Sequence, residues 1–224
     1  MSNSKFEPIE QATFCFAASS TILSDFLSPS FSPGQTLMAS QKVQIPTRRW
    51  SQEEIDFDRV EAERRFRDHD ITDWRETIGR VMTNRPDEMV TRHGGDEWKA
   101  VASMCRFNLE WTDQILEDLD TREESVETEI QALRIGDFGI VSNSTEFFTT
   151  LGLKVREDAN LPHLMLACYA NGRIGYLPDA HDVRKKSYAA YQSPKYCNQF
   201  PFTKESGQVM VQGMAKLINL LGQQ

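Results

Sequence analysis

The feature that most constrains the fold is a change of hydrophobic period near residue 124. Between Glu97 and Leu119, apolar residues recur at steps of three and four, which predicts one long amphipathic helix. Directly afterwards, VETEIQALRI and FGIVSN are typical of strands, and Gly136–Asp137 between them predicts a two-residue hairpin turn. The helical stripe is interpreted as a packing face and consists of Trp98, Val101, Ala102, Cys105, Leu109, Thr112, Leu116 and Leu119.

The rest of the chain alternates between helix and strand patterns. STEFFTTLGLKVRE predicts a helix, HLMLACYAN predicts a second buried strand, and residues 206–221 predict a final helix. A strand, a helix and a further strand in this order favour parallel neighbouring strands in one layered domain. We therefore expect an α/β fold, with a mixed sheet flanked by helices and preceded by helical segments.

The amino-terminal part has a different composition. Residues 1–40 are weakly apolar and end in SPSFSPGQT, so we expect a weakly structured segment and linker followed by one domain over residues 41–224. Within that domain, KVQIPTRR predicts a short strand ending at Pro46.

Two helix starts can be placed from capping residues. Ser51 precedes Glu54 by three positions, which predicts a capping box and then one or two surface helices as far as about Met82. The glycine pair in RHGGDEW breaks this pattern, and Asp96 is expected to cap the long helix.

Charge and cysteine usage exclude several classes of function. The net charge of −8 argues against a general nucleic-acid binder, which needs clustered Lys and Arg to neutralise phosphates. The main basic run, Arg184 to Lys186, is interpreted as a solvated surface.

The cysteines have no CxxC spacing, so we expect buried free thiols, with a single disulfide as the alternative. They are Cys15, Cys105, Cys168 and Cys197.

Targeting signals are equally weak. No stretch approaches the roughly 18 consecutive apolar residues of a transmembrane segment. ATFCFAASSTIL follows two glutamates and lacks a basic region before it, so we expect no secretory signal, and the localisation stays open.

Two side chains at predicted strand ends are candidates for chemistry. Glu146 follows the strand FGIVSN, and groups at the carboxyl ends of strands face the crevice where α/β proteins bind ligands. The alternative role is a surface acid that complements a helix dipole. Tyr176 ends a very short strand between the turn at Asn171–Gly172 and Pro178, so it is expected at the same rim.

The segments around both residues resemble a known family. IQALRIGDFGIVSNSTEFFTTLGLKVRE and HLMLACYANGRIGYLPDAHDV are similar to the carboxyl-terminal half of the catalytic domain of neutral/alkaline non-lysosomal ceramidases, particularly the bacterial ceramidase-like hydrolases. The family's Pro-Gly-Glu-Phe turn stands here as Ser144-Thr145-Glu146-Phe147, and its Asn-x-Tyr-x-x-Tyr motif has Arg173 in place of the first tyrosine.

This resemblance implies a zinc-dependent amidase that cleaves N-acyl bonds of ceramide or a related lipid amide. The family's zinc is held by two histidines, a glutamate and a tyrosine, and the last two correspond to Glu146 and Tyr176. The histidine-bearing amino-terminal half has no counterpart here, so the zinc site is expected to be incomplete in this chain. Family members are often secreted.

The four histidines of this chain are interpreted as surface side chains or as side chains whose hydrogen bonds are satisfied within the fold. His181 is the one expected nearest the rim; the four are His69, His93, His163 and His181.

Three interpretations fit these observations. The preferred one is a fragment or half of a ceramidase-like amidohydrolase, either a truncated product or part of a split enzyme, inactive alone and acting in sphingolipid metabolism once complemented. The second is a non-catalytic binding or scaffold protein descended from that fold, in which Glu146 and Tyr176 are structural. The third is an unrelated α/β domain. Because a half-domain leaves apolar surface and a sheet edge open, we expect a complementary chain or a homo-oligomer.

Overall fold

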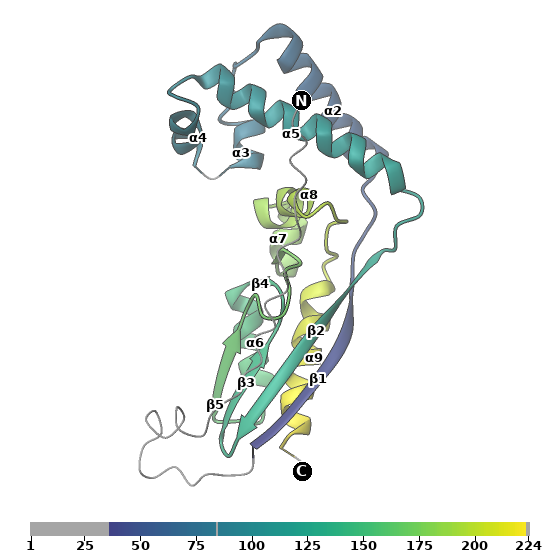
Figure 1. Cartoon of the computed structure of the whole chain (residues 1–224), viewed down its shortest axis with the longest axis vertical. Helices are drawn as coiled ribbons and strands as arrows, with labels where there is room; N and C mark the ends of the chain where they lie inside the picture. The colour runs from purple at the N-terminus through teal and green to yellow at the C-terminus, as the bar shows by residue number, and fades with distance from the viewer. Residues whose placement is uncertain (1–35, 84, 223–224) are drawn as a thin grey trace, which may run out of the picture.

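The computed structural model of the chain describes residues 36–83 and 85–222. They form a mixed four-stranded sheet with helices on one face, and a second group of helices beyond one end of the sheet (Figure 1). This arrangement confirms the predicted α/β class. The strands run in the order β1 (Thr36–Pro46), β2 (Ser125–Ile135), β3 (Phe138–Ser142) and β5 (His163–Ala167).

The register of the sheet follows from its turns. Strands β1 and β2 pair antiparallel along their whole length, and β2 continues into β3 through the predicted hairpin at Gly136–Asp137. Gly136 has φ of +57°, the left-handed conformation that glycine adopts without strain. Strand β5 pairs parallel with β3, as predicted, because helix α6 (Thr149–Asp158) connects them. Only one face of β5 is buried, however, because α6 and α9 cover one face of the sheet: Leu164 is 6% exposed, whereas Met165 on the other face is 51% exposed.

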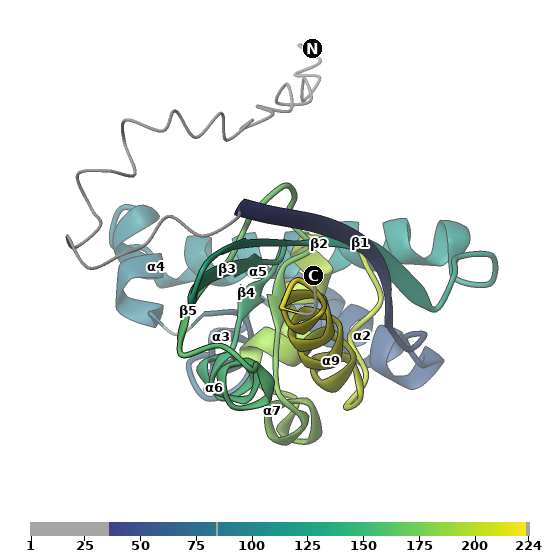
Figure 2. The same cartoon turned by 90° about the horizontal axis from the view of Figure 1, so that it is seen from below.

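Helix α9 (Ser206–Leu220) covers the sheet and carries much of the core. It packs beside α6 on one face of the sheet, as seen from below (Figure 2). The approach is close at Gly139, where a Cβ would lie 2.4 Å from Leu161 and 3.0 Å from Ile218. Fully buried residues from strand and helix meet in this core; they include Ile45, Ile130, Val141, Met210, Val211 and Met214.

The helical group is an insertion between β1 and β2. It contains α2 (Gln52–Asp68), α3 (Ile78–Met82), α4 (Pro86–Arg92) and α5 (Glu97–Asp118). The expectation that helical segments precede the sheet is therefore wrong, because the first strand precedes them. That strand begins at Thr36, inside the segment expected to be a linker; residues 1–35 of that segment lie outside the described residues.

The predicted caps are confirmed, and the predicted helix face is partly right. Ser51 and Glu54 form the capping box of α2, and the Asp96 side chain accepts from the Lys99 backbone N–H at the start of α5. In α5, Leu116 is 40% exposed, whereas Trp111 and Ile115 are buried. The buried face shifts because the end of α5 packs against a second cluster containing Trp50, Ile55 and Phe200.

A buried lysine joins the helical insertion to the segment before α9. That segment contains α7 (Ala180–Lys185), the π-helix η1 (Tyr188–Gln192) and α8 (Ser193–Tyr196). Lys195 of α8 has a fully buried side chain, and its ammonium lies 2.6 Å from the Asp58 carboxylate of α2. Its Nζ also lies 4.2, 4.6 and 5.6 Å from the ring centres of Tyr191, Trp111 and Trp50. A charge in this position is compensated both by its ion pair and by the aromatic faces.

The described residues also bear on the expectations about membrane-spanning segments and cysteine thiols. Within 36–83 and 85–222, no helix combines the length and hydropathy that crossing a membrane requires. Cys105, Cys168 and Cys197 are free thiols, but only Cys105 is buried and Cys168 is exposed, so the prediction of buried thiols is right for one of the three. Cys15 lies outside the described residues.

Candidate functional site

A buried asparagine turn places Glu146 at the end of β3. The Asn143 side-chain oxygen accepts from the Thr145 backbone N–H at 2.9 Å and from its hydroxyl at 2.6 Å. Both residues are fully buried, so the turn is fixed from within. The chain then enters the two-residue strand β4 (Glu146–Phe147), and α6 starts only at Thr149. The prediction that the helix begins before Glu146 is therefore wrong, because the turn directs these residues into a strand.

Strand β4 brings Glu146 beside Tyr176. It pairs parallel with β6 (Tyr176–Leu177), and the two residues are register partners. The Glu146 N–H donates to the Gly175 carbonyl at 2.9 Å, and the Ile174 N–H donates to the Ser144 carbonyl at 3.0 Å. Since register partners on adjacent strands project from the same face, the carboxylate and the phenol lie side by side.

A second tyrosine binds the same carboxylate. Tyr169, which follows β5, donates its hydroxyl hydrogen to Glu146 Oε2. Strands β3 and β5 are parallel neighbours, so the residues that follow them meet at one edge of the sheet. Tyr169 was not predicted, although the rule that identified Glu146, a polar side chain directly after a parallel strand, applies equally to it.

The pKa values of the phenols around the carboxylate are raised. A hydrogen bond to Glu146, with burial as the next cause, raises the pKa of Tyr176 to about 12. Burial together with the hydrogen bond to Glu146 also raises the pKa of Tyr169. Burial and the Glu146 charge raise the pKa of Tyr188 in η1. At neutral pH the site therefore presents one carboxylate surrounded by neutral hydroxyl groups.

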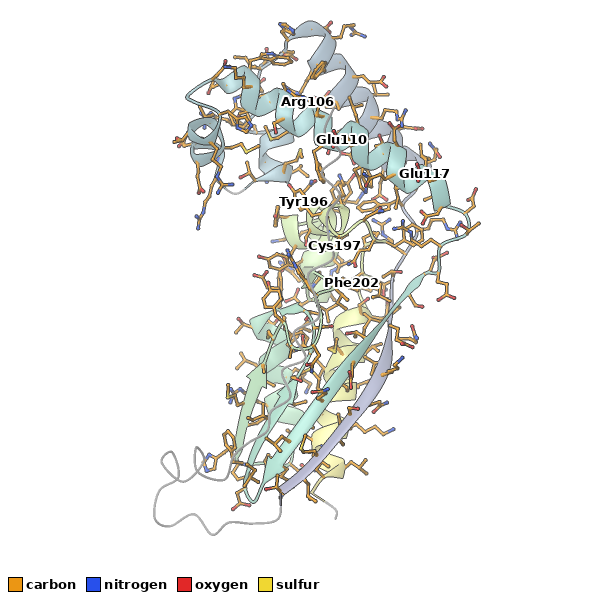
Figure 3. The ribbon with its side chains drawn as sticks, viewed as in Figure 1. Arg106, Glu110, Glu117, Tyr196, Cys197 and Phe202 are labelled. Carbon is orange, nitrogen blue, oxygen red and sulfur yellow. The ribbon has the colours of Figure 1, made fainter. Side chains whose placement is uncertain are left out.

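Aromatic rings connect this carboxylate–tyrosine site to the helical insertion. The Tyr176 ring lies 6.2 Å from Tyr188 and 6.4 Å from Phe148, both edge to face. Tyr188 in turn lies 6.4 Å from Tyr196, which lies 4.7 Å from Phe107 of α5. Figure 3 labels Tyr196 and Cys197 where the helical insertion meets the sheet part, below Arg106 and Glu110 of α5.

A cavity of about 480 Å³ lies along the same aromatic row. Tyr188 and Tyr196 form part of its wall, and the remaining wall comes from α3, α4, α5 and the α3–α4 connection. Much of the lining is apolar or sulfur-containing, with two arginines and a glutamate among the polar groups. The other lining residues are Met82, Thr83, Arg85, Glu88, Met89, Arg92, Ser103, Met104 and Phe107.

The described residues do not form a complete zinc site. Glu146 and Tyr176 offer two adjacent oxygen ligands, whereas zinc sites need three or four protein ligands. In the described part of the chain, no group of three or more His, Cys, Asp or Glu side chains is arranged to hold a metal ion. The donor set that the resemblance implies is thus represented here only by its oxygen half.

Two of the histidine side chains contact other groups, and the other two are exposed. His69 ends α2 and stacks on Trp98 at 4.5 Å, and His93 Nδ1 lies 2.9 Å from the Met89 carbonyl oxygen. His163 begins β5 and is exposed. The exposed His181 belongs to the first turn of α7, where its backbone N–H donates to the capping Asp179.

Comparison with known proteins yields only remote similarity. No family model matches the chain, and no curated protein matches it. The crystal structure of neutral ceramidase from Pseudomonas aeruginosa is similar over 45% of this chain and 16% of its own, with 18% identity and a TM-score of 0.36. A ceramidase complexed with C2 gives 17% identity, a TM-score of 0.36, and coverage of 45% and 15%. The chain thus spans about a sixth of these proteins, and the relationship is distant at most.

Proposed function

We propose that this chain supplies the carboxylate–phenol part of a ceramidase-like hydrolase site for N-acyl lipid amides. The observation that supports the proposal is the register pairing of Glu146 with Tyr176, because these are the two residues that the motif resemblance assigned to one site. They lie 30 positions apart in the sequence (176 − 146), so nothing local requires them to meet.

The protonation pattern of the site suits an amide. A secondary amide presents one acceptor, its carbonyl oxygen, and one donor, its N–H. The Tyr176 hydroxyl has a single hydrogen, which it donates to Glu146 in the free chain, and it would turn to donate this hydrogen to the carbonyl oxygen of a bound amide. The Glu146 carboxylate accepts hydrogen bonds and holds the neighbouring Tyr169 hydroxyl in place. An ester would use only the first of these two contacts.

Part of the wall of the cavity beyond Tyr188 is apolar, as a lipid tail requires, and the rest is polar. Met82, Met89, Met104 and Phe107 line it, and Tyr188 belongs both to this wall and to the aromatic row beside Tyr176. Methionine and aromatic side chains adapt to flexible hydrocarbon chains. The amide group of a bound lipid would then lie near Glu146, with its acyl chain directed toward the insertion.

Hydrolysis requires groups that the described residues lack. If zinc takes part, it belongs to a completed site in which Glu146 and Tyr176 would be two oxygen ligands and a complementary chain would provide the histidines. We therefore expect the chain alone to bind a lipid amide without turning it over.

The test is binding and hydrolysis of a fluorescent N-acyl lipid amide, compared with its ester analogue. We expect saturable binding with a higher affinity for the amide than for the ester. Tyr176→Phe and Glu146→Gln should each lower the affinity for the amide about 2- to 10-fold, because each removes one hydrogen bond. Leu153→Ser, at a 61% exposed position on α6, is the matched control and should bind as wild type. Equal binding by all variants would contradict the site assignment.

The hydrolysis measurement separates an enzyme from a binding protein. Fatty-acid release should require zinc and a complementary chain that supplies histidine ligands, and it should be lost in Glu146→Gln. Turnover by the purified chain alone would show that the site is complete. Lipid binding that never leads to turnover in any complemented sample would favour the non-catalytic alternative.

A further inference from the structure

Helix α4 and the residue before it turn a charged face toward the cavity. Their residues in the cavity wall are Arg85, Glu88, Met89 and Arg92. These positions are three or four residues apart, so they follow one face of the helix. No residue of α4 is buried, and the side chains of Arg85 and Arg92 are 73% and 68% exposed. The cavity is therefore bordered on this side by charged groups that water can reach.

The charges on this face favour an anion. Arg85 and Arg92 share one carboxylate, because Arg85 Nη1 donates to Glu88 Oε2 at 3.2 Å and Arg92 donates to Glu88 Oε1. Two guanidinium groups and one carboxylate leave the wall with an excess of one positive charge. The whole chain has a net charge of −8, so this excess is a local property of the cavity.

The wall from outside the insertion favours an uncharged group. It consists of Tyr188 of η1 and Tyr196 of α8. The charge of Glu146 acts on this side, since together with burial it raises the pKa of Tyr188. An anion near Tyr188 would therefore be repelled, whereas one near α4 would be attracted. The apolar part of the wall comes from Met82, Met104 and Phe107 in addition to Met89.

We propose that the cavity binds a single-chain fatty acid, with its carboxylate at Arg85 and Arg92 and its hydrocarbon chain against the methionine and aromatic side chains. Guanidinium groups bind carboxylates through charge-assisted hydrogen bonds, which are stronger than neutral ones. The volume of about 480 Å³ lies within the range of about 300 to 1,000 Å³ that is usual for pockets of small organic ligands.

This binding site is independent of the proposed function, since it requires neither Glu146 nor Tyr176. One consequence does rest on that function. Hydrolysis of an N-acyl amide releases a fatty acid, and a fatty acid held at α4 would occupy the space expected for the acyl chain of the next substrate. The product and the substrate would then exclude each other from the cavity.

The test is calorimetric titration of the full chain with decanoate, below its micelle concentration, and with decanol as the uncharged analogue. Decanoate should bind more tightly than decanol, and added salt should reduce the difference. Arg85→Gln and Arg92→Gln should each lower the affinity for decanoate about 2- to 5-fold, because each removes one exposed ion pair, and should leave decanol binding unchanged. The matched control is Arg80→Gln, at an exposed position of α3 outside the cavity wall, which should bind decanoate as wild type.

Glu88→Gln separates a binding role of the arginines from a structural one. Removal of the shared carboxylate frees both guanidinium groups, so decanoate should bind about 2- to 5-fold more tightly. Glu146→Gln should bind decanoate as wild type, so the result does not depend on whether the proposed amide site exists. Absence of decanoate binding would overturn the proposal. Equal affinities for decanoate and decanol that the arginine variants leave unchanged would also overturn it.

Discussion

At the scale of single residues, Glu146 determines the state of the tyrosines around it. Its charge is close to three phenols, and each of them has a raised pKa. A carboxylate in contact with phenols makes their ionised forms less stable, since two negative charges would then be neighbours. The effect of the carboxylate is therefore expected in the alkaline range, above the ordinary tyrosine pKa of about 10.

Removing this charge should be visible in the titration of Tyr176. In Glu146→Gln we expect the Tyr176 pKa to fall from about 12 toward its ordinary value of about 10. Tyrosine labelled with ¹³C at the ζ carbon allows each of the five tyrosines to be followed by NMR as the pH is raised. Glu157→Gln on the outer side of α6 is the control and should leave the titration unchanged. A Tyr176 pKa that stays near 12 in Glu146→Gln would show that burial, not the carboxylate, causes the shift.

At the scale of elements, the start of α2 depends on a buried acid. Glu54 completes the capping box with Ser51. Its carboxylate also accepts hydrogen bonds from Arg48 and from Lys186, the C-cap residue directly after α7. Burial alone would raise the pKa of Glu54, but these hydrogen bonds outweigh it and lower the pKa to about 2. One carboxylate therefore links the first helix of the insertion to the segment before α9.

This lowered pKa predicts a specific loss of stability in acid. The stabilisation is complete above the unfolded-state pKa of about 4.5 and disappears as the pH falls through the folded-state pKa of about 2. Urea unfolding between pH 6 and pH 2 should show a decrease from this group of about 2 to 3 kcal/mol. Glu54→Gln, which preserves the capping box, should remove that decrease, whereas Glu53→Gln at the exposed neighbouring position should keep it. Parallel profiles for wild type and Glu54→Gln would contradict the assignment.

The sequence was sufficient for elements whose signals are local. The hairpin glycine, both helix caps and the period of α5 depend on neighbouring residues, and all four of these features were predicted. Tyr176 was expected to end its strand, but it begins β6, as Glu146 begins β4, and the role of both residues stays a prediction. The β4–β6 pair and Tyr188 depend on contacts between distant segments, which periodicity does not encode, whereas Tyr169 follows a predicted parallel strand and could have been predicted.

At the scale of the whole molecule, a buried aromatic and ionic junction joins the insertion to the segment before α9, in addition to the contact of Glu54 with Lys186. Trp50 and Trp111 lie on one side, and Tyr191 and Lys195 lie on the other. The Lys195 ammonium and the Asp58 carboxylate are both withdrawn from water, so each needs the other. Because Tyr188 lies in the same short stretch of chain, the junction also fixes one wall of the cavity near the site.

Breaking this buried pair should cost more than losing both of its members. Lys195→Met leaves Asp58 buried and uncompensated, so we expect a decrease of about 3 to 5 kcal/mol in the free energy of unfolding. Adding Asp58→Leu should restore most of this loss, as measured by urea unfolding. The matched control is Lys154→Met, whose pair with Glu157 is exposed and should contribute at most about 1 kcal/mol. Additive losses in the double variant would mean that the two side chains do not interact.

The pairing of Pro46 with Ser125 has a consequence for how this molecule tolerates change. These two residues are the last partners of the β1–β2 ladder, so the insertion of residues 47–124 leaves the sheet and returns to it at adjacent points. The entropy of closing such an excursion rises only by about 0.6 kcal/mol for each doubling of its length. The closure cost therefore allows α3 and α4 to change in length, because the residues Asp58 and Trp111 of the buried junction lie on α2 and α5 instead. The residues that line the cavity can thus change while the strands that position Glu146 and Tyr176 stay in register.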